Sequence, residues 1–124
     1  MKVIIFLLLI VLSVVPVNAS YGCAPLCYVI PSSNGGNNNN PGTESSPWAT
    51  ISYAATQATA GTTVYVKSGT YYNKISFTNN GNSTHWITIT NYPGNFPVIN
   101  LSSVSIEHYN GMVMFVNNNN IKFN

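Results

Sequence analysis

Short runs of apolar residues recur along this chain with a period of about 23 residues. Two interleaved series carry the period, one at residues 64–66, 87–89 and 112–115, the other at residues 75–77, 98–100 and 121–123. In most runs apolar and polar side chains alternate, which is typical of half-buried strands. Two strand series that share one period predict a chain that winds, with each turn laid on the turn before. We therefore expect an all-β fold, a parallel β-solenoid.

Residues 1–19 have the pattern of a secretory signal peptide. Lys2 supplies the positive charge, an apolar run follows at residues 3–15, and small residues precede Ser20. The alternative is a membrane anchor, but a spanning helix needs roughly 20 apolar residues and this run is shorter. We expect cleavage, secretion to the extracellular space, and no membrane association afterwards. In the remaining chain we expect an opening strand with an Asn/Gly/Ser-rich loop at residues 20–47, and a capping helix with the first coils of the solenoid at residues 48–124.

Charged residues are few after the signal peptide. They are Lys67, Lys74 and Lys122 against Glu44 and Glu107, with no Asp and no Arg. Nucleic-acid binding requires clustered Lys and Arg, and anionic lipid surfaces require a polybasic segment. The composition therefore excludes nucleic acid and membrane surfaces as expected partners.

Cys23 and Cys27 follow the signal peptide, and secretion would place them in an oxidising compartment. A local bridge between them and pairing with cysteines beyond Asn124 are both open. Two thiolates leave a structural zinc site half built, so we expect no metal and no cofactor. Asn82 and Asn100 begin N-x-[ST] sequons and are candidate glycosylation sites, although an Asn-rich and Ser/Thr-rich chain also generates sequons by chance.

One apolar stripe has helical rather than strand spacing. Its members are Ile51, Ala54, Ala55 and Ala58. Thr50 is a suitable N-cap and Gly61 stands where helices end, so we expect a helix over residues 50–60. Because an open solenoid end exposes strand edges and apolar core, we expect this helix to cap the N-terminal end.

Residues 31–47 consist almost wholly of turn-forming residues. In isolation this segment is typical of a disordered linker. The four consecutive Asn residues at 37–40 are interpreted as low-complexity sequence rather than as a site.

The residues also carry a family pattern. Residues 28–29 read YV, residues 40–43 NPGT, residues 46–51 SPWATI, residues 61–66 GTTVYV and residues 69–71 GTY. This order resembles the opening of right-handed parallel β-helix proteins of the pectate-lyase-like superfamily, in particular the uncharacterised domain that begins many of them. The resemblance covers about residues 28–124 and implies a right-handed parallel β-helix with an N-terminal capping helix, truncated after two to three coils. One departure is Asn where the family often has Asp before NPGT.

Fold analogy alone does not assign an activity, because this superfamily includes polysaccharide lyases, polygalacturonases and adhesins. Glycoside hydrolysis needs paired carboxylates, and calcium-dependent elimination needs an oxygen cage; two Glu residues and no Asp supply neither. The candidate bases for calcium-free elimination are Lys67, Lys74, His85 and His108. The competing interpretation is that these four are solvated surface groups. We therefore predict no catalytic residue in this segment.

Binding is better supported than catalysis. Tyr65 and Lys67 should point outward from their strand, and Tyr71 and Tyr72 offer further flat aromatic faces. These four residues are our candidate polysaccharide-binding set, with half-buried structural tyrosines as the alternative. We expect association with extracellular or cell-wall polysaccharide. The alternatives are the N-terminal fragment of a polysaccharide lyase and a cell-surface or adhesion scaffold module.

The C-terminal residues 121–124 end in a strand with no second capping element after it. An uncovered strand edge is a template for pairing with another chain. We therefore expect end-to-end self-association of this segment.

Overall fold

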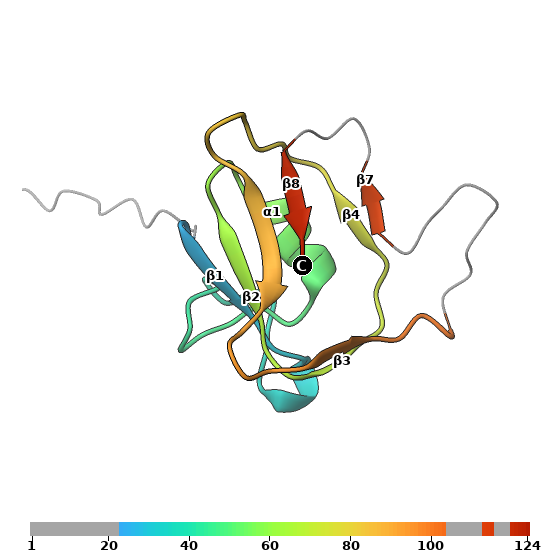
Figure 1. Cartoon of the computed structure of the whole chain (residues 1–124). Coiled ribbons are helices and arrows are strands. Elements are labelled where there is room, and N and C mark those ends of the chain that lie inside the picture. The colour runs from blue at the N-terminus through green and yellow to red at the C-terminus, as the bar shows by residue number, and fades with distance from the viewer. Residues whose placement is uncertain (1–22, 104–112, 116–119) are drawn as a thin grey trace, which may run out of the picture.

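The computed structural model describes residues 23–103, 113–115 and 120–124 (Figure 1). The expected signal peptide at residues 1–19 lies outside the described residues, as do Glu107 and His108. In chain order the elements are β1 (Leu26–Val29), the short 3-10 helix η1 (Ser32–Asn34), α1 (Ile51–Gln57), β2 (Thr63–Val66), β3 (Gly69–Tyr71), β4 (Ile75–Phe77), β5 (Ile87–Asn91), β6 (Pro97–Ile99), β7 (Val113–Phe115) and β8 (Ile121–Phe123).

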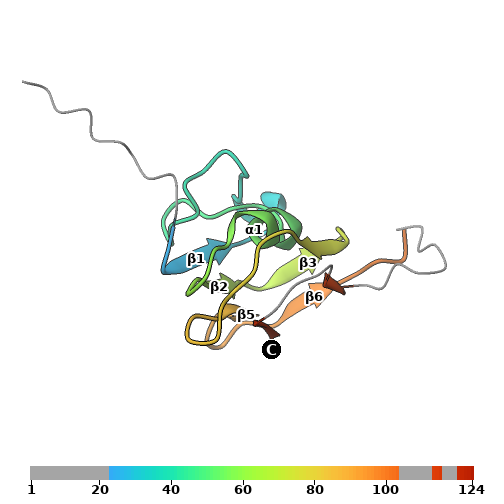
Figure 2. The ribbon, with the colours of Figure 1, turned by 90° about the horizontal axis from the view of Figure 1, so that it is seen from above.

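Every strand pair among the described residues is parallel. The strands form three sheets with the orders β1-β2-β5-β8, β3-β6 and β4-β7. Strands β2, β3 and β4 make one coil, and β5, β6 and β7 lie on them in the same order, as the stacked ribbons of Figure 2 show. This winding fits a right-handed β-helix and confirms the predicted parallel solenoid.

The predicted period of about 23 residues and its two strand series are wrong in detail. Each coil has three strands, and the register partners Val64 and Ile89 lie 25 positions apart, whereas Ile87 pairs with Ile121 much further along. Strand β7 therefore lies on β4 and strand β8 on β5, the reverse of the expected series. The physical reason is that the loops between strands differ in length, so equal spacing of strand starts does not identify partners.

The expected alternation of apolar and polar side chains is confirmed in three strands. Val64 and Val66 of β2 are buried, and Tyr65 between them is only half-buried. The same alternation buries Ile75 and Phe77 in β4 and Ile87 and Ile89 in β5. Burying each such side chain stabilises the fold by about 1.5–3 kcal/mol relative to leaving it exposed. These residues form the interior of the coils.

Helix α1 is shorter than predicted. It runs Ile51–Gln57, and its C-cap Ala58 already has extended backbone, so the helix stops before Gly61. The N-cap prediction is correct, since the Thr50 hydroxyl accepts a hydrogen bond from the backbone N–H of Tyr53. The predicted apolar stripe is buried, and α1 contacts β4 and β1. Figure 2 shows the helix at the β1 end of the stack, away from the C-terminus.

The segment at residues 31–47 is ordered, not a disordered linker. It turns back along β1, where the Tyr28 N–H donates to the Gly42 carbonyl and the Trp48 N–H donates to the Tyr28 carbonyl. Trp48 also forms a parallel bridge with Val29. A glycine is required at residue 42, because a Cβ there would overlap the Trp48 indole. The loop therefore covers the outer edge of β1.

The structure joins Cys23 to Cys27 in a disulfide just before and within β1. Of the two pairings left open by the sequence, the local bridge is the one formed. Among the described residues, neither helix is long and apolar enough to cross a membrane.

Candidate functional site

Three tyrosines meet on the outer face of the largest sheet. Tyr28 of β1 pairs in register with Tyr65 of β2, and Tyr92 follows directly after β5. Their ring centroids are 5.7 Å apart for Tyr28 and Tyr65, 5.7 Å for Tyr65 and Tyr92, and 6.1 Å for Tyr28 and Tyr92. All three are half-buried. We call these three residues the tyrosine cluster.

One cation and one carboxylate lie against the tyrosine cluster. The Lys67 ammonium is 5.3 Å from the Tyr92 ring centroid and 5.7 Å from that of Tyr28, within the range of cation–π attraction. It also lies 3.9 Å from Glu44 Oε1, which accepts a 2.9 Å hydrogen bond from the Tyr92 hydroxyl. That hydrogen bond and the negative charge of Glu44 raise the pKa of Tyr92.

Strand alternation positions these side chains. In β2, Val64 and Val66 point into the coil, so Tyr65 points outward, and Lys67 continues the outward series. The backbone ladder extends past the strand ends, because the Lys67 N–H donates to the Val29 carbonyl and the Tyr92 N–H to the Val66 carbonyl. Stacked coils thus bring outward residues from three strands into one surface.

The chemistry that this surface offers is binding chemistry. It combines aromatic faces, phenol hydroxyls, one ammonium and one carboxylate. Glu44 is the single side-chain carboxylate in the part of the chain that the structure describes, so no pair for acid–base hydrolysis exists there. Within the same residues, no three His, Cys, Asp or Glu side chains gather as a metal site would need.

The candidate binding residues from the sequence separate in space. Tyr65 and Lys67 lie together in or beside the tyrosine cluster. Tyr71 does not, and its proposed role as a binding face is wrong. Its side chain is 4% exposed, and its hydroxyl donates to the carbonyl of Lys67 at 2.8 Å inside the coil. Tyr72 is 56% exposed but has no ring contact with the cluster among the described residues.

The other candidate bases lie outside the tyrosine cluster. His85 is exposed, and its Nδ1 lies 2.8 Å from the Thr84 hydroxyl, while Lys74 stands between β3 and β4. Sequence reasoning missed Tyr28, Tyr92 and Glu44. Extending the strand alternation to β1 and past β5 would have found the two tyrosines. No local signal could have found Glu44, because its loop reaches the cluster only in the folded chain.

The two sequons differ in exposure. Asn82 is exposed, and its Oδ1 accepts hydrogen bonds from the backbone N–H and the hydroxyl of Thr84, the third residue of the sequon. Asn100 is half-buried, and its Oδ1 accepts from the N–H of Ser102. Glycosylation at both positions stays a prediction.

Parallel strands stacked coil upon coil define the class of this protein as a β-helix protein. Residues 27–123 match the family model described as "Pel9A-like, right handed beta helix region", and the chain belongs to this family. The match confirms the resemblance to pectate-lyase-like β-helix proteins and indicates a polysaccharide-related fold.

Among curated proteins, the chain is 34% identical over 88 residues to the uncharacterized protein YwoF of Bacillus subtilis (strain 168). The aligned region covers 71% of this chain and 18% of that relative, so the chain spans less than a fifth of its length. No solved structure matches this chain.

Proposed function

We propose that this protein is secreted and binds extracellular or cell-wall polysaccharide through the tyrosine cluster. The observation that carries the proposal is the convergence of Tyr28, Tyr65 and Tyr92 with Lys67 on one outer face. The family match, which indicates a polysaccharide-related fold, supports it. The signal-peptide pattern of residues 1–19 supports secretion.

A tyrosine suits a sugar because it has an apolar face and a polar end. Sugar rings present C–H groups on their faces and hydroxyls at their edges, so both parts of the side chain find a partner. Strands in a sheet lie about 4.8 Å apart, so three adjacent strands give a surface about 10 Å across. That width suits a short stretch of linked sugars better than a single one.

Lys67 favours an acidic polysaccharide. Its side chain is 22% exposed and can pair with a uronate carboxylate, while Glu44, 53% exposed, can accept hydrogen bonds from sugar hydroxyls. The Lys67 ammonium would then either leave Glu44 and pair with the uronate carboxylate, or contact both carboxylates at once. Hydrogen bonds between charged partners are shorter and stronger than neutral ones, which gives this contact weight in selecting the ligand.

Titration of the purified chain with pectin, alginate and chondroitin fragments tests the proposal, with tyrosine fluorescence and calorimetry as readouts. We expect Tyr65→Ala and Lys67→Met each to weaken binding about tenfold, which corresponds to about 1.4 kcal/mol. The matched controls Tyr72→Ala and Lys74→Met, outside the tyrosine cluster, should bind as the original chain does. Absence of a fluorescence or heat change with every polysaccharide would contradict the proposal.

Uronate elimination is the second candidate function, favoured by the placement of Lys67 on the same face as the aromatic rings. A lyase creates unsaturated uronate ends, which absorb in the ultraviolet. Binding without new ultraviolet absorbance would indicate a binding protein. New absorbance that is lost in Lys67→Met would indicate that Lys67 acts as the base. If the chain shows neither binding nor new absorbance, the result favours a scaffold module.

A further inference from the structure

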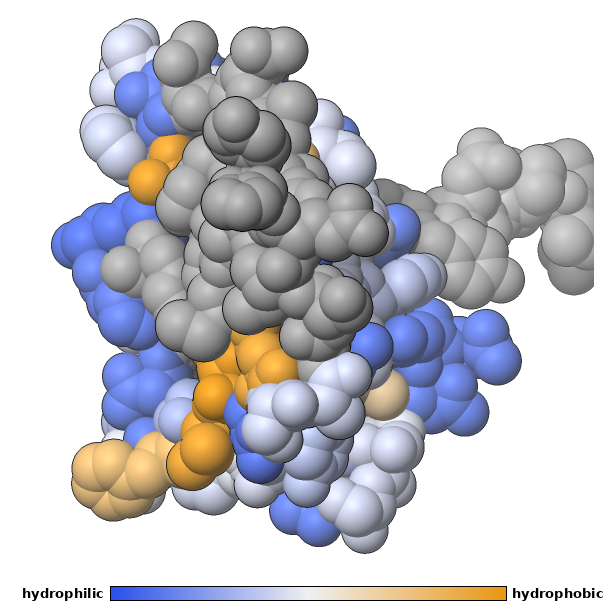
Figure 3. All heavy atoms as spheres, turned by 90° about the vertical axis from the view of Figure 1, so that its right-hand side faces the viewer, coloured by the Kyte–Doolittle hydropathy of each residue, from blue (hydrophilic) through white to orange (hydrophobic). Residues whose placement is uncertain are grey.

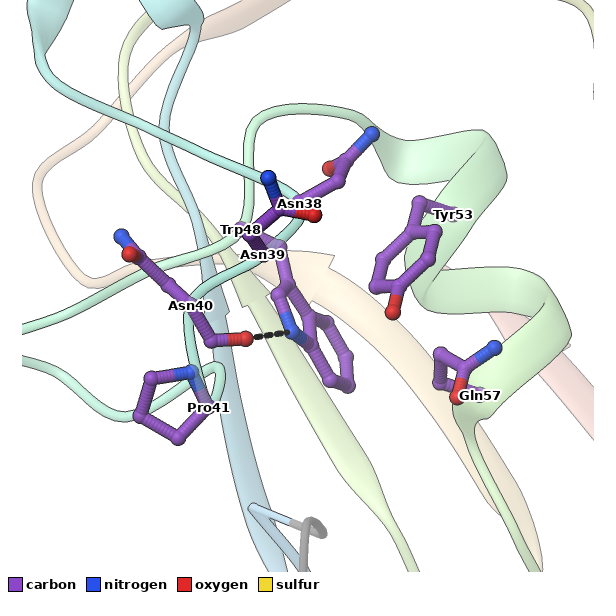
Figure 4. Close-up of a pocket in the computed structure, with 7 residues that line it drawn as sticks. All are labelled: Asn38, Asn39, Asn40, Pro41, Trp48, Tyr53 and Gln57. Atoms are coloured by element: carbon purple, nitrogen blue, oxygen red, sulfur yellow. Dashed lines mark hydrogen bonds between the residues drawn. The ribbon is translucent and has the colours of Figure 1, made fainter.

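A hollow of about 280 Å³ lies between helix α1 and the loop that precedes it. Figure 4 shows the residues around it, which come from the loop, from the bridge to β1 and from the helix. They are Asn38, Asn39, Asn40, Pro41, Trp48, Tyr53 and Gln57. None of these seven residues is charged, and none belongs to the tyrosine cluster. We call this hollow the amide pocket.

The loop side of the amide pocket is fixed by its own hydrogen bonds. Asn38 Oδ1 accepts from the backbone N–H groups of Ala49 and Thr50, at 2.9 and 3.2 Å, and Asn38 Nδ2 donates to the Thr50 hydroxyl. Asn40 Nδ2 donates to the Pro47 carbonyl at 2.9 Å. Side chains held this way lose little further freedom when a ligand binds.

The aromatic wall is fixed as well. Trp48 is 3% exposed, and its Nε1–H donates to the Asn40 carbonyl at 2.8 Å, as the dashed line of Figure 4 marks. The Tyr53 ring meets the indole edge-on, with centroids 5.4 Å apart. The pocket therefore has an apolar side made of two rings whose orientation is set before any ligand arrives.

Several polar groups of the amide pocket are not hydrogen-bonded to other described residues of the protein. Within the described residues, the side-chain amide of Asn39 and the hydroxyl of Tyr53 make no hydrogen bond, and Gln57 engages only its Nε2, with the Thr56 hydroxyl. Tyr53 and Gln57 are four residues apart on α1 and so lie on one face of the helix. Donors and acceptors thus converge beside an aromatic wall.

We propose that the amide pocket binds one neutral sugar residue. Each free amide offers a donor and an acceptor, which matches the hydroxyls of a sugar, and the half-buried Tyr53 ring, which packs edge-on against Trp48, matches its C–H face. The volume lies just below the range of about 300–1,000 Å³ typical of small-molecule sites, which suits a single ring. A pocket without charge gives a uronate carboxylate no partner, so acidic sugars bind less well here. The inference does not rest on the tyrosine cluster.

Trp48 emission provides the test, because its indole forms the wall of the amide pocket. The chain has two tryptophans and the other, Trp86, is 48% exposed, so Trp86→Phe isolates the signal of Trp48. In this background the methyl glycosides of glucose, galactose, mannose and xylose are titrated beside the methyl glycoside of galacturonic acid, whose carboxylate is free. We expect a saturable change with at least one neutral glycoside and a weaker or absent change with galacturonate.

Variants locate the binding. Tyr53→Phe and Asn39→Ala should each weaken binding about tenfold, the loss expected for one hydrogen bond to a bound ligand. The matched controls Tyr72→Phe and Asn73→Ala lie on the exposed loop after β3 and should not change the affinity. Tyr53→Phe keeps the ring that contacts Trp48, and near-ultraviolet circular dichroism checks that the fold is retained.

Three outcomes would overturn the inference. They are no response to any neutral glycoside, an unchanged affinity in both pocket variants, or a loss of neutral-sugar binding in Lys67→Met, which would assign that binding to the tyrosine cluster. If the chain does not bind acidic polysaccharide but a neutral sugar still shifts Trp48 emission, the proposed function is wrong and the inference about the amide pocket stands.

Discussion

The Tyr71 side chain lies inside the coil, where its hydroxyl donates hydrogen bonds to the carbonyl oxygens of Lys67 and Val29. Burial raises the pKa of the Tyr71 phenol above its ordinary value of about 10. The folded state therefore favours the neutral phenol, so this stabilisation is complete below pH of about 10 and is lost as the pH rises toward the folded-state pKa. We expect the free energy of unfolding to fall steeply above pH of about 10.

Urea unfolding at about pH 8 and about pH 11 tests this expectation. Tyr71→Phe should lose about 1 kcal/mol at the lower pH, where it lacks the hydrogen bond, and should then fall less steeply than the original chain. Tyr72→Phe, which changes an exposed tyrosine, should keep the original slope. Parallel pH profiles for Tyr71→Phe and the original chain would contradict the assignment.

The hydrogen-bond partners of the four Asn residues at 37–40 could not be predicted from the sequence. Composition alone favours a featureless tract. In the fold, Asn38 binds the backbone N–H groups of Ala49 and Thr50, and Asn40 binds the Pro47 carbonyl. An amide side chain can serve almost any backbone group, so its partner depends on which one the fold brings near.

At the scale of elements, local patterns predicted most of the strands but missed β3 (Gly69–Tyr71), and they did not predict which strands pair. Side-chain alternation is a property of a few adjacent residues, and it placed Val64 and Val66 inside correctly. Pairing depends on the loops, and these vary: Ile75 pairs with Val113, much further along than the 25 positions that separate Val64 from Ile89. Turn-forming residues show no regular spacing, so the length of each loop, and with it the pairing of the strands, cannot be predicted from the local pattern.

Thr50 links helix α1 to the loop before it. Its hydroxyl accepts from the Tyr53 N–H at 3.1 Å and from Asn38 Nδ2 at 3.2 Å. Thr50→Ala removes both contacts, and we expect a loss of about 1–2 kcal/mol in the free energy of unfolding. Thr50→Ser keeps the hydroxyl and should stay within about 0.5 kcal/mol. Urea denaturation midpoints compare the two variants.

Hydrogen exchange on the same pair tests our proposal that α1 caps the solenoid. If it does, Thr50→Ala should also speed exchange in β1 and β4, the strands that α1 contacts. Faster exchange confined to the helix itself would show that α1 is an attachment rather than a cap. Thr50→Ser should exchange as the original chain does throughout.

At the scale of the whole molecule, the tyrosine cluster combines residues that are far apart in the sequence. Tyr65 and Lys67 were predicted because they lie two residues apart, Tyr65 in β2 and Lys67 directly after it. Tyr28 and Tyr92 join them only because β1, β2 and β5 are neighbours in one sheet. A site built across coils is thus predictable strand by strand, but its assembly requires the pairing that the sequence left undetermined.

End-to-end self-association stays a prediction, and it concerns the end of the stack that β6, β7 and β8 form. In the part of the chain that the structure describes, β6, β7 and β8 each pair with a strand on one side only. Phe96 is 81% exposed and Val98 in β6 is 55% exposed. Figure 3 shows a small apolar patch in the lower half of the side that it views. An unpaired edge next to apolar side chains is a template for another chain. Light scattering of the purified chain should therefore give a mass above that of the monomer, rising with concentration.

A charge on this edge should reverse the association, because lysine on an edge strand opposes pairing with another strand. We expect Val98→Lys to move the measured mass toward the monomer. The matched control is Leu26→Lys, since Leu26 is 45% exposed on β1 but the outer edge of that strand is covered by the segment around Gly42 and Trp48. A monomer at every concentration would contradict the expectation outright. Equal dispersal by both lysines would show that general charge, rather than the edge at β6, controls the association.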